Sequence, residues 1–433
     1  MKDNFVVLGA GAAGLGAVNR FHNEGIRAKV YEKCAFAGGH AASYFSNGWI
    51  FDDGPHISFT KDERIRKLFH ESVNGEVEAF KALATNYWQG HWIKHPAQVN
   101  LHGLPEDMVV KIIMEMMDAK AAESSEINNY QDWLYASYGP TFSETFPMMY
   151  TKKFHTAHAS VLDTDWIGPR LYQPDMEEVL HGALSMHTPD VHYISDFYYP
   201  THGGFARFFD QFPEYGDMNY GHEVVEIDPA GKYLVFADGQ GDVFSGLVSS
   251  LPLPELIPLI KGAPVDVVEA AARLACSECV TVNIGIDRED ISEAHWTYFY
   301  DEDIPFARIS FPHMQSPNNT PDGCGSIQME VYFSKKYKPM TGDADSCIQP
   351  AIDGLFKCGL LKPEDKILFK EARYAPYANV IFDLERNAAL ELVHGYLDEI
   401  GIRYCGRFGE WGYHWTDGSF ISGEGAAQKI LNH

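Results

Sequence analysis

Four residues near the N-terminus, three glycines and one acid, have the types and the spacing that bind a dinucleotide. Gly9, Gly11 and Gly14 follow the apolar run FVVLG, and Glu32 ends the next apolar run, KVYE. In such a fingerprint the first glycine allows a tight turn, the second lets the backbone approach a pyrophosphate, and the third lets a helix pack on a strand. Glu32 would accept hydrogen bonds from a ribose diol. The pattern favours a dinucleotide site over a glycine-rich turn without a ligand.

A strand, a helix and a second strand must position these four residues. The sequence predicts strands over 5–9 and 29–32, joined by a helix that ends at Gly25. The N-terminus of that helix would offer free N–H groups to the phosphates of the ligand.

The seven cysteines indicate neither a disulfide framework nor a metal site. Their number is odd and they are scattered through a large chain. Cys276 and Cys279 form one C-x-x-C motif, but no second pair follows at the spacing of a zinc site. We therefore expect no bound metal.

Charge and hydropathy limit the possible partners. The chain of 433 residues has a formal net charge of -26, which argues against binding to nucleic acid or to an anionic membrane. An anionic substrate would then need a local basic pocket. No stretch approaches eighteen consecutive apolar residues, and no secretory pattern precedes the first strand. We expect a cytoplasmic protein that acts on a small molecule.

The rest of the chain predicts interleaved helical and extended segments. Helices are expected over 61–73, from 106 to 120 and in aromatic-rich stretches to about 190, with no strands between them. Later segments predict a hairpin, further strands, a helix and a last short strand, at 222–240, 247–254, 279–287, 297–300, 306–311, 326–333, 384–401 and 402–405. No repeat or linker separates them, so we expect interleaved domains.

Several of these segments together resemble a known superfamily. The fingerprint, Gly38 and Gly39, HGGFARFF, HEVVEI and GSFISGEGAA resemble the FAD-dependent amine oxidase and protoporphyrinogen oxidase superfamily. Within it, the chain is most similar to UDP-galactopyranose mutases, particularly the eukaryotic type. The similar segments are FDDGPHISF, HWIKHPAQVNLHGLP, VSSLPLPEL, TYFYDEDIPFARISF and GRFGEWGYHWTDGSFISG. The resemblance spans nearly the whole chain, although 105–195 matches poorly.

This resemblance implies an α/β fold in which a Rossmann-like FAD-binding domain is interleaved with a helical domain and a mixed β-sheet substrate domain. The FAD domain would be discontinuous, built from 1–80, 200–260 and 400–433. Residues 81–199 would form the mainly helical domain, and 261–399 the substrate domain.

The resemblance also implies a reaction. In these mutases N5 of reduced flavin attacks the anomeric carbon of a nucleotide-linked sugar, the nucleotide leaves, and the sugar ring recloses in the other size without net redox change. FAD would be bound without a covalent link. No second fingerprint occurs in the chain, so any NAD(P)H that reduces the flavin would have to enter the same cleft.

The resemblance assigns most of the cofactor site. Gly9, Gly11, Gly14 and Glu32 would bind the ADP half of FAD, and His56 matches a histidine in a loop over the flavin. The other implied cofactor residues are Gly38, Gly39, Gly54, Val224, Arg407, Asp417, Ser419 and Phe420.

Substrate residues are assigned in the same way. Arg308 and Tyr298 match a pair that grips the nucleotide diphosphate, for which the fork of a guanidinium is well suited. Tyr377 and Tyr413 match two further tyrosines at the diphosphate. His56, Arg308 and Arg407 would be the residues closest to the chemistry.

The chain also departs from the mutase pattern. Met148 occupies the position of a second diphosphate arginine, although Lys152 and Lys153 are near it in sequence. Gln315 occupies the position of a third tyrosine, and Pro55 replaces a glycine before His56. Pro55 has a fixed φ and no N–H, so we expect a stiffer loop there.

Three functions are consistent with the sequence. The first is a flavin-dependent pyranose–furanose mutase that acts on a nucleotide-linked sugar. The second is a net oxidoreductase of the same fold, such as an amine oxidase or desaturase, favoured by the missing arginine and the apolar 105–170 region. The third is a non-enzymatic protein that keeps FAD for structure alone.

Overall fold

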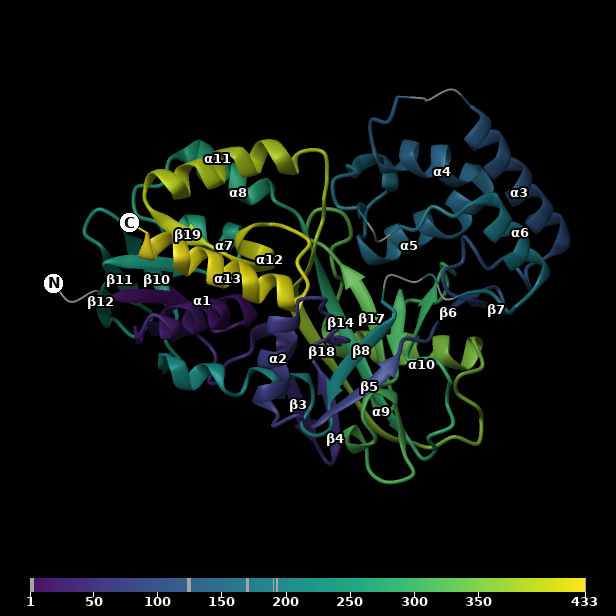
Figure 1. Ribbon diagram of the computed structural model, residues 1–433, viewed down its shortest axis with the longest axis horizontal. Helices are drawn as coiled ribbons and strands as arrows, with labels where there is room; N and C mark the ends of the chain where they lie inside the picture. The colour runs from purple at the N-terminus through teal and green to yellow at the C-terminus, as the bar shows by residue number, and fades with distance from the viewer. Residues whose placement is uncertain (1–3, 123–125, 169–170, 190, 192–193, 433) are drawn as a thin grey trace.

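The computed structural model describes residues 4–122, 126–168, 171–189, 191 and 194–432. Figure 1 shows three parts: a small parallel sheet with its helices on the left, a helical part at the upper right, and a large sheet at the lower centre and right. No helix in these described ranges is both long and apolar enough to cross a membrane.

The small sheet is parallel throughout and has five strands. Its order is β19 (Ile402–Tyr404), β13 (Gly246–Ser249), β1 (Phe5–Leu8), β2 (Lys29–Glu32) and β9 (Asp217–Tyr220). These strands come from distant stretches of the chain, as expected for an interleaved Rossmann-like domain. An antiparallel sheet of β10 (Val224–Asp228), β11 (Tyr233–Phe236) and β12 (Gly241–Val243) contains the predicted hairpin.

Two helices, α1 (Ala12–Asn23) and α13 (Thr416–Leu431), pack against each other beside this sheet. Glycines make the contact possible, because a Cβ on Gly16 would lie 2.0 Å from the Phe420 carbonyl oxygen. A Cβ on Gly423 would likewise lie 1.8 Å from the Ala13 carbonyl oxygen. The C-terminal helix is thereby fixed against the helix of the glycine fingerprint.

The large sheet has seven strands and is mixed. Its order is β18 (Ile367–Val380), β14 (Cys276–Ile286), β17 (Gly325–Phe333), β16 (Arg308–Ser310), β15 (Trp296–Phe299), β6 (Ala84–Trp88) and β7 (His91–Lys94). Only the β15–β6 pair is parallel. The predicted α/β class with a mixed sheet is confirmed.

The expectation of no strands between the early helices is wrong. After α2 (Glu63–Ser72), β5 (Val77–Lys81) pairs with β8 (Asp196–Pro200), and β6 and β7 form a hairpin that joins the large sheet. Both Gln89 and Gly90 at the tip of this hairpin have positive φ, 46° and 86°, as a two-residue turn requires. Each strand has only four or five residues of mixed polarity, so the alternation is too short to stand out in the sequence.

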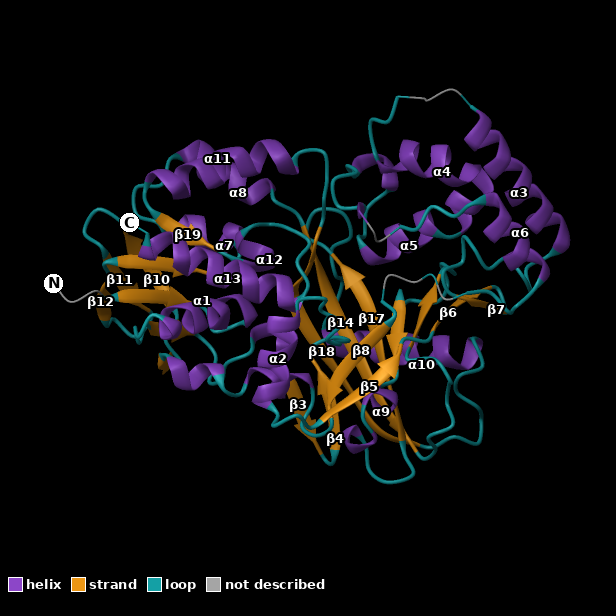
Figure 2. Ribbon diagram, viewed as in Figure 1, coloured by secondary structure: helices purple, strands orange, loops and turns teal. Residues whose placement is uncertain are grey.

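Four helices form the upper right part in Figure 2: α3 (Glu106–Ala121), α4 (Tyr130–Thr145), α5 (Pro147–Phe154) and α6 (Met176–Leu184). The backbone of α4 is interrupted at Gly139, which has a φ of 72° and approaches α3 closely. The carboxylate of Glu115 on α3 accepts hydrogen bonds from the backbone N–H and the hydroxyl of Thr141 at this interruption. The helical part therefore has a fixed internal geometry.

The described residues also form further helices and strands. They are β3 (Ser43–Ser46), β4 (Trp49–Asp52), α7 (Leu253–Leu259), α8 (Val265–Arg273), α9 (Pro312–Gln315), α10 (Ile348–Lys357), α11 (Arg386–Glu399) and α12 (Gly406–Gly409).

Candidate functional site

The turn from β1 to α1 has the tight geometry that the glycine fingerprint predicts. Gly9 has a φ of 88°, a left-handed backbone that other residues rarely adopt. A Cβ on Gly14 would lie 1.9 Å from the carbonyl oxygen of Gly9, so a side chain cannot fit there. The helix is thus held directly against the end of the strand.

Gly38 and Gly39 lie against this turn. Gly38 forms a bridge with Gly11 and donates its N–H to the Ala10 carbonyl oxygen at 2.8 Å. A Cβ on Gly39 would lie 3.0 Å from the Cα of Gly11. The result is a cradle made of backbone next to the N-terminus of α1, where no side chain caps the free N–H groups. Such a cradle fits a pyrophosphate.

The carboxylate of Glu32 lies at the other side of this cradle. Its two oxygens accept hydrogen bonds from the N–H groups of Ala10 and Cys34, each at 2.8 Å. A carboxylate has about four acceptor sites, so two remain for hydroxyl groups of a ligand. His222 donates its backbone N–H to the Glu32 carbonyl oxygen. Val224, two residues after His222, begins β10.

Asp417 and Ser419 lie in the first turn of α13, and no side chain caps that turn. The ring of Phe420 is fully buried and packs 4.8 Å from the ring of Phe212, so it belongs to the core. The backbone of Phe420 meets Gly16 of α1. Of the three residues predicted in this turn, Phe420 could therefore face a ligand only through its backbone.

His56 and Arg407 come together from opposite ends of the chain. The Nδ1 of His56 lies 2.8 Å from the Gly54 carbonyl oxygen, and Gly54 has a φ of 109°. The ring of His56 retains some accessible surface, but closely surrounding protein lowers its pKa to about 4, and the charge of Arg407 contributes in the same direction. Arg407 donates to the carbonyl oxygens of His414 and Ala378 and lies over the ring of Tyr413, 5.6 Å from its centre. Tyr413 also lines a cavity.

The cavity, of about 170 Å³, is lined by residues of both the helical part and the large sheet. Three of the predicted substrate residues, Tyr298, Arg308 and Tyr413, line it. The remaining lining is aromatic or uncharged and comes from two stretches of the chain and two single positions: His95, Pro96, Ala97 and Gln98; Tyr130, Tyr138, Phe142, Phe146, Pro147, Tyr150, Thr151, Phe154, His155, Trp166, Leu171 and Tyr172; Val191; and Tyr300.

Arg308 is held in this cavity by a buried acid. Its Nε and Nη2 donate to the two carboxylate oxygens of Glu330 at 2.5 and 2.9 Å, across the β16–β17 pair. Tyr332 donates to the same carboxylate at 2.6 Å. The Nη1 of Arg308 makes no hydrogen bond with a described residue, so a donor is left for a ligand. The interaction with Glu330 raises the pKa of Arg308 against the effect of burial.

Tyrosine side chains surround the guanidinium. Tyr298 lies directly opposite Arg308 in the β15–β16 pair, and the ring of Tyr150 contacts Tyr298 at 5.4 Å. Burial raises the pKa of both tyrosines, while the positive charge of Arg308 opposes the shift. Neutral hydroxyls and one guanidinium together can bind an anionic oxygen.

One predicted substrate residue is placed differently. Tyr377 on β18 does not line the cavity; its ring packs 5.4 Å from Phe408, and burial followed by the charge of Glu255 raises its pKa.

The positions that depart from the mutase pattern also lie outside the cavity. Met148 packs against the core, Lys153 donates to the Asp301 carbonyl oxygen at 3.0 Å, and Lys152 pairs with Glu302. Gln315 is buried on α9. None of these four side chains lines the cavity.

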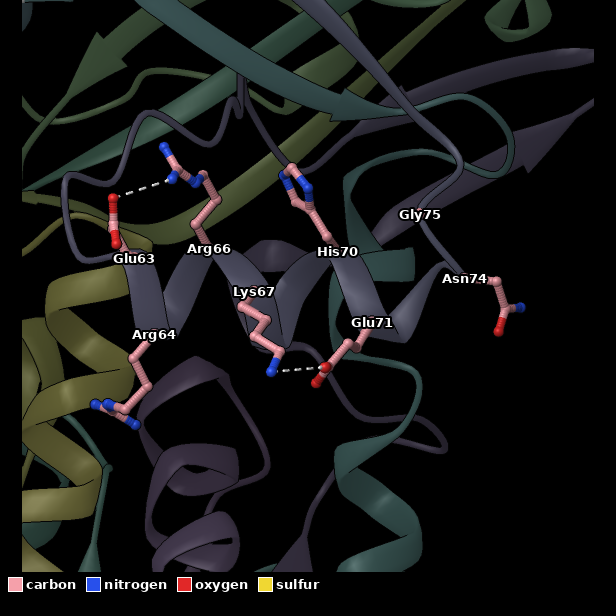
Figure 3. A pocket seen from close by; sticks show the side chains of 8 residues that line it. All are labelled: Glu63, Arg64, Arg66, Lys67, His70, Glu71, Asn74 and Gly75. Carbon is pink, nitrogen blue, oxygen red and sulfur yellow. Dashed lines mark ion pairs between the residues drawn. The ribbon is translucent and has the colours of Figure 1, made fainter.

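A second hollow is shallow and lies along α2. Figure 3 shows its side chains, mostly charged, pointing outward from one helix, with ion pairs between Glu63 and Arg66 and between Lys67 and Glu71. It contains none of the predicted site residues. The aromatic cavity is therefore the better candidate for a substrate site.

Comparisons with known proteins agree with this geometry. A family model described as an NAD(P)-binding Rossmann-like domain matches residues 7–72. A crystal structure of reduced UDP-galactopyranose mutase has a TM-score of 0.92 and 24% sequence identity, covering 100% of this chain and 96% of that one. This chain has the fold of that mutase. The predicted superfamily resemblance is thus confirmed at the level of the fold.

Oxidases have the same fold at greater distance. A putative protoporphyrinogen oxidase from Exiguobacterium sp. 255-15 has a TM-score of 0.77 and 13% identity, covering 100% of both chains. Putrescine oxidase bound to putrescine has a TM-score of 0.66 and 14% identity, covering 100% of this chain and 99% of that one. The fold alone is therefore shared by a mutase and by oxidases.

Several cavity residues were not predicted individually. His95 and Gln98 lie in HWIKHPAQVNLHGLP, a segment whose resemblance was visible in the sequence. Tyr150 and His155 lie in the poorly matching helical part, where no pattern separates a cavity aromatic from a core aromatic.

Proposed function

We propose that the chain binds one FAD without a covalent link and acts as a pyranose–furanose mutase on a nucleotide-linked sugar. The observation that carries this proposal is that the backbone cradle and the aromatic cavity are connected through residues that contact one another. His40, which directly follows Gly39 of the backbone cradle, is close enough to His56 to affect its pKa, and its ring lies 6.0 Å from the ring of Phe408, the neighbour of Arg407. Arg407 lies over Tyr413, which lines a cavity with an available guanidinium donor.

The residues present fit the cofactor. Gly9, Gly11, Gly38 and Gly39 leave a cradle that side chains would fill, and it lies at an uncapped helix N-terminus where phosphates are favoured. Glu32 retains acceptor capacity for a ribose diol. FAD would supply, when reduced, a nucleophilic nitrogen that can displace the nucleotide from the anomeric carbon of the sugar.

The chain's own residues would bind and orient the substrate. Arg308 would donate from Nη1 to a phosphate oxygen, while Glu330 keeps the guanidinium plane fixed. Tyr298 and Tyr413 would add hydroxyl donors, and the aromatic walls would exclude water from the departing phosphate. His56, neutral because its pKa is lowered to about 4, would stand beside the cofactor without adding a second positive charge.

An FAD-dependent oxidoreductase is the second candidate. It is favoured by Met148, which stands where the mutases have an arginine, and by the many apolar and aromatic side chains of the cavity. An uncharged amine or alcohol would fit such walls, and the distant oxidase structures share the fold.

Binding measurements test the proposal. Purified protein should show the absorption of oxidised flavin, and acid precipitation should release the flavin into solution. Thermal shifts against UDP-galactose and other nucleotide sugars, with the flavin oxidised and then reduced, should show stabilisation by at least one of them. A colourless protein that does not take up added FAD would refute the proposal.

A further inference from the structure

His155 is a buried histidine in the cavity wall that makes no side-chain hydrogen bond with the described residues. Its exposed fraction is 3%, it lines the cavity at the end of α5, and its Nδ1 is enclosed without a partner. Nε2 is not enclosed and makes no hydrogen bond with a described residue, so it is the ring nitrogen that a cavity ligand can reach. Burying a polar group without partners costs free energy, so a chain normally keeps such a group only where something compensates it.

The backbone beside His155 is held in place. Thr156 has a φ of 60°, in the left-handed region that is rarely adopted by a β-branched residue. Its hydroxyl donates to the carbonyl oxygen of His155 at 2.6 Å and lies 2.6 Å from the hydroxyl of Ser334, the residue after β17; Thr156 and Ser334 are both buried. Strained backbone that is fixed in this way is common at ligand sites. The backbone that carries His155 is therefore fixed by the fold.

Among the residues that the structure describes, no charged group affects the pKa of His155. Trp166 and Phe154 pack against its ring at 5.1 and 5.0 Å. Burial is the only cause that lowers its pKa, to about 4, so the ring is neutral at pH 7 and has one donor and one acceptor. A neutral imidazole suits an uncharged polar group much better than a phosphate.

We propose that His155 is a specificity-determining residue whose Nε2 forms a hydrogen bond with an uncharged polar group of the cavity ligand. This inference rests on the proposed function, in which that ligand is a nucleotide sugar and the uncharged group is on its nucleoside or its sugar. Arg308 would then bind the anionic part of the ligand, and His155 the neutral part.

Two substitutions test the inference through opposite effects on stability and affinity. His155→Phe keeps the shape of the ring and removes both nitrogens. We expect an unchanged or higher melting temperature without ligand, because an unsatisfied polar group is lost, together with about ten-fold weaker binding of UDP-galactose. His155→Gln, which retains a donor and an acceptor, should recover part of that affinity.

His295→Phe is the matched control. His295 is as well buried, with an exposed fraction of 6%, but its Nδ1 accepts from the Leu83 N–H and it lies outside the cavity. This variant should melt at a lower temperature and bind UDP-galactose as the wild type does. A His155→Phe protein with wild-type affinity would overturn the inference.

Histidine-selective ¹⁵N NMR separates this inference from the proposed function. Uridine or methyl galactoside, as neutral probes, should shift the His155 ring signals, whereas inorganic pyrophosphate should not. If UDP-galactose binds but neither neutral probe nor UDP-galactose shifts these signals, the inference fails and the proposed function survives. If a neutral probe shifts them and no nucleotide sugar binds, the proposed function fails and the inference survives.

Discussion

The glycine cradle and the aromatic cavity are built by different means. The cradle is made of backbone at Gly9, Gly11, Gly38 and Gly39, with one carboxylate beside it. The cavity is made of side chains that come from five parts of the chain, at 95–98, 130–172, 191, 298–308 and 413. A backbone site tolerates almost no added atoms, while a side-chain site changes its ligand when single residues are exchanged. This difference explains how one fold can serve a mutase and oxidases.

The largest expected effect is at the cradle. Gly14→Ala places a Cβ 1.9 Å from the Gly9 carbonyl oxygen, so α1 must move away from β1. We expect loss of dinucleotide binding and of most soluble protein, measured by flavin content and yield. Gly425→Ala on α13 is the control, because its Cβ would meet nothing within 4 Å. That substitution should stabilise the helix by about 0.5–1 kcal/mol. Equal flavin content in the two variants would contradict the account of the cradle.

In the cavity, Arg308→Lys retains the charge and removes the planar fork. We expect the affinity for a nucleotide sugar to fall by about 10- to 100-fold, with an unchanged flavin spectrum. Arg288→Lys is a matched control, because Arg288 pairs with Asp365 through Nε and Nη2 in the same way and lies outside the cavity. Isothermal titration calorimetry measures the affinity of each variant for a nucleotide sugar. Equal affinities would show that Arg308 does not contact the ligand.

Glu32 tests the side-chain component of the cradle. Glu32→Ala removes the acceptor for the Ala10 and Cys34 N–H groups and for a ribose diol. Affinity for FAD should weaken by about 1–3 kcal/mol, and Glu32→Gln, which keeps one acceptor, should lose less. Fluorescence titration of the apoprotein with FAD measures the change. Unaltered affinity in Glu32→Ala would place the ribose elsewhere.

A smaller effect is expected in the pH dependence of stability. The pKa of His155 is lowered to about 4, so below pH 6.5 the unfolded chain binds a proton that the folded protein does not. The wild type should therefore lose stability relative to His155→Phe as pH falls from 6.5 to 4, with a slope of up to about 1.4 kcal/mol per pH unit. Denaturant unfolding at several pH values measures this difference. A constant difference would show that His155 is not desolvated.

Other groups affect both proteins alike and cancel in this comparison. His56 and His295 also have a pKa of about 4 and add the same loss of stability on acidification. Burial raises the pKa of Asp52 to about 6, so its contribution is present at low pH and is lost as pH rises through 6.

The two regions also differ in how far the sequence predicts them. The cradle could be predicted because Gly9, Gly11, Gly14 and Glu32 are close in sequence, and each has a local steric or hydrogen-bonding role. The parallel sheet could be predicted because its strands, such as FVVLG, are strongly apolar. The role of Phe420 stays a prediction; spacing did not show that its ring lies in the core.

The cavity could be predicted only in part. Tyr298 and Arg308 are paired on adjacent strands, so their separation in sequence carries structural information. The lining from the helical part depends on how α4 and α5 lie over the sheet, which no local pattern determines. Tyr377, predicted by the same resemblance, lies beside Glu255 and not in the cavity. The domain boundaries stay predictions, although β6 and β7 extend the large sheet into the segment expected to be helical.

The most direct test of the central claim is product analysis under argon with the flavin first oxidised and then reduced by dithionite. UDP-galactose and a panel of other nucleotide sugars are the substrates, and chromatography with NMR identifies the ring size of each sugar. The proposed function predicts that at least one pyranose is converted to its furanose, and only by the reduced protein. The flavin should stay reduced through many turnovers. When air is admitted, the only hydrogen peroxide should be that formed by reoxidation of the flavin itself. Unchanged nucleotide sugars, together with stoichiometric peroxide from an amine or alcohol in air, would contradict it.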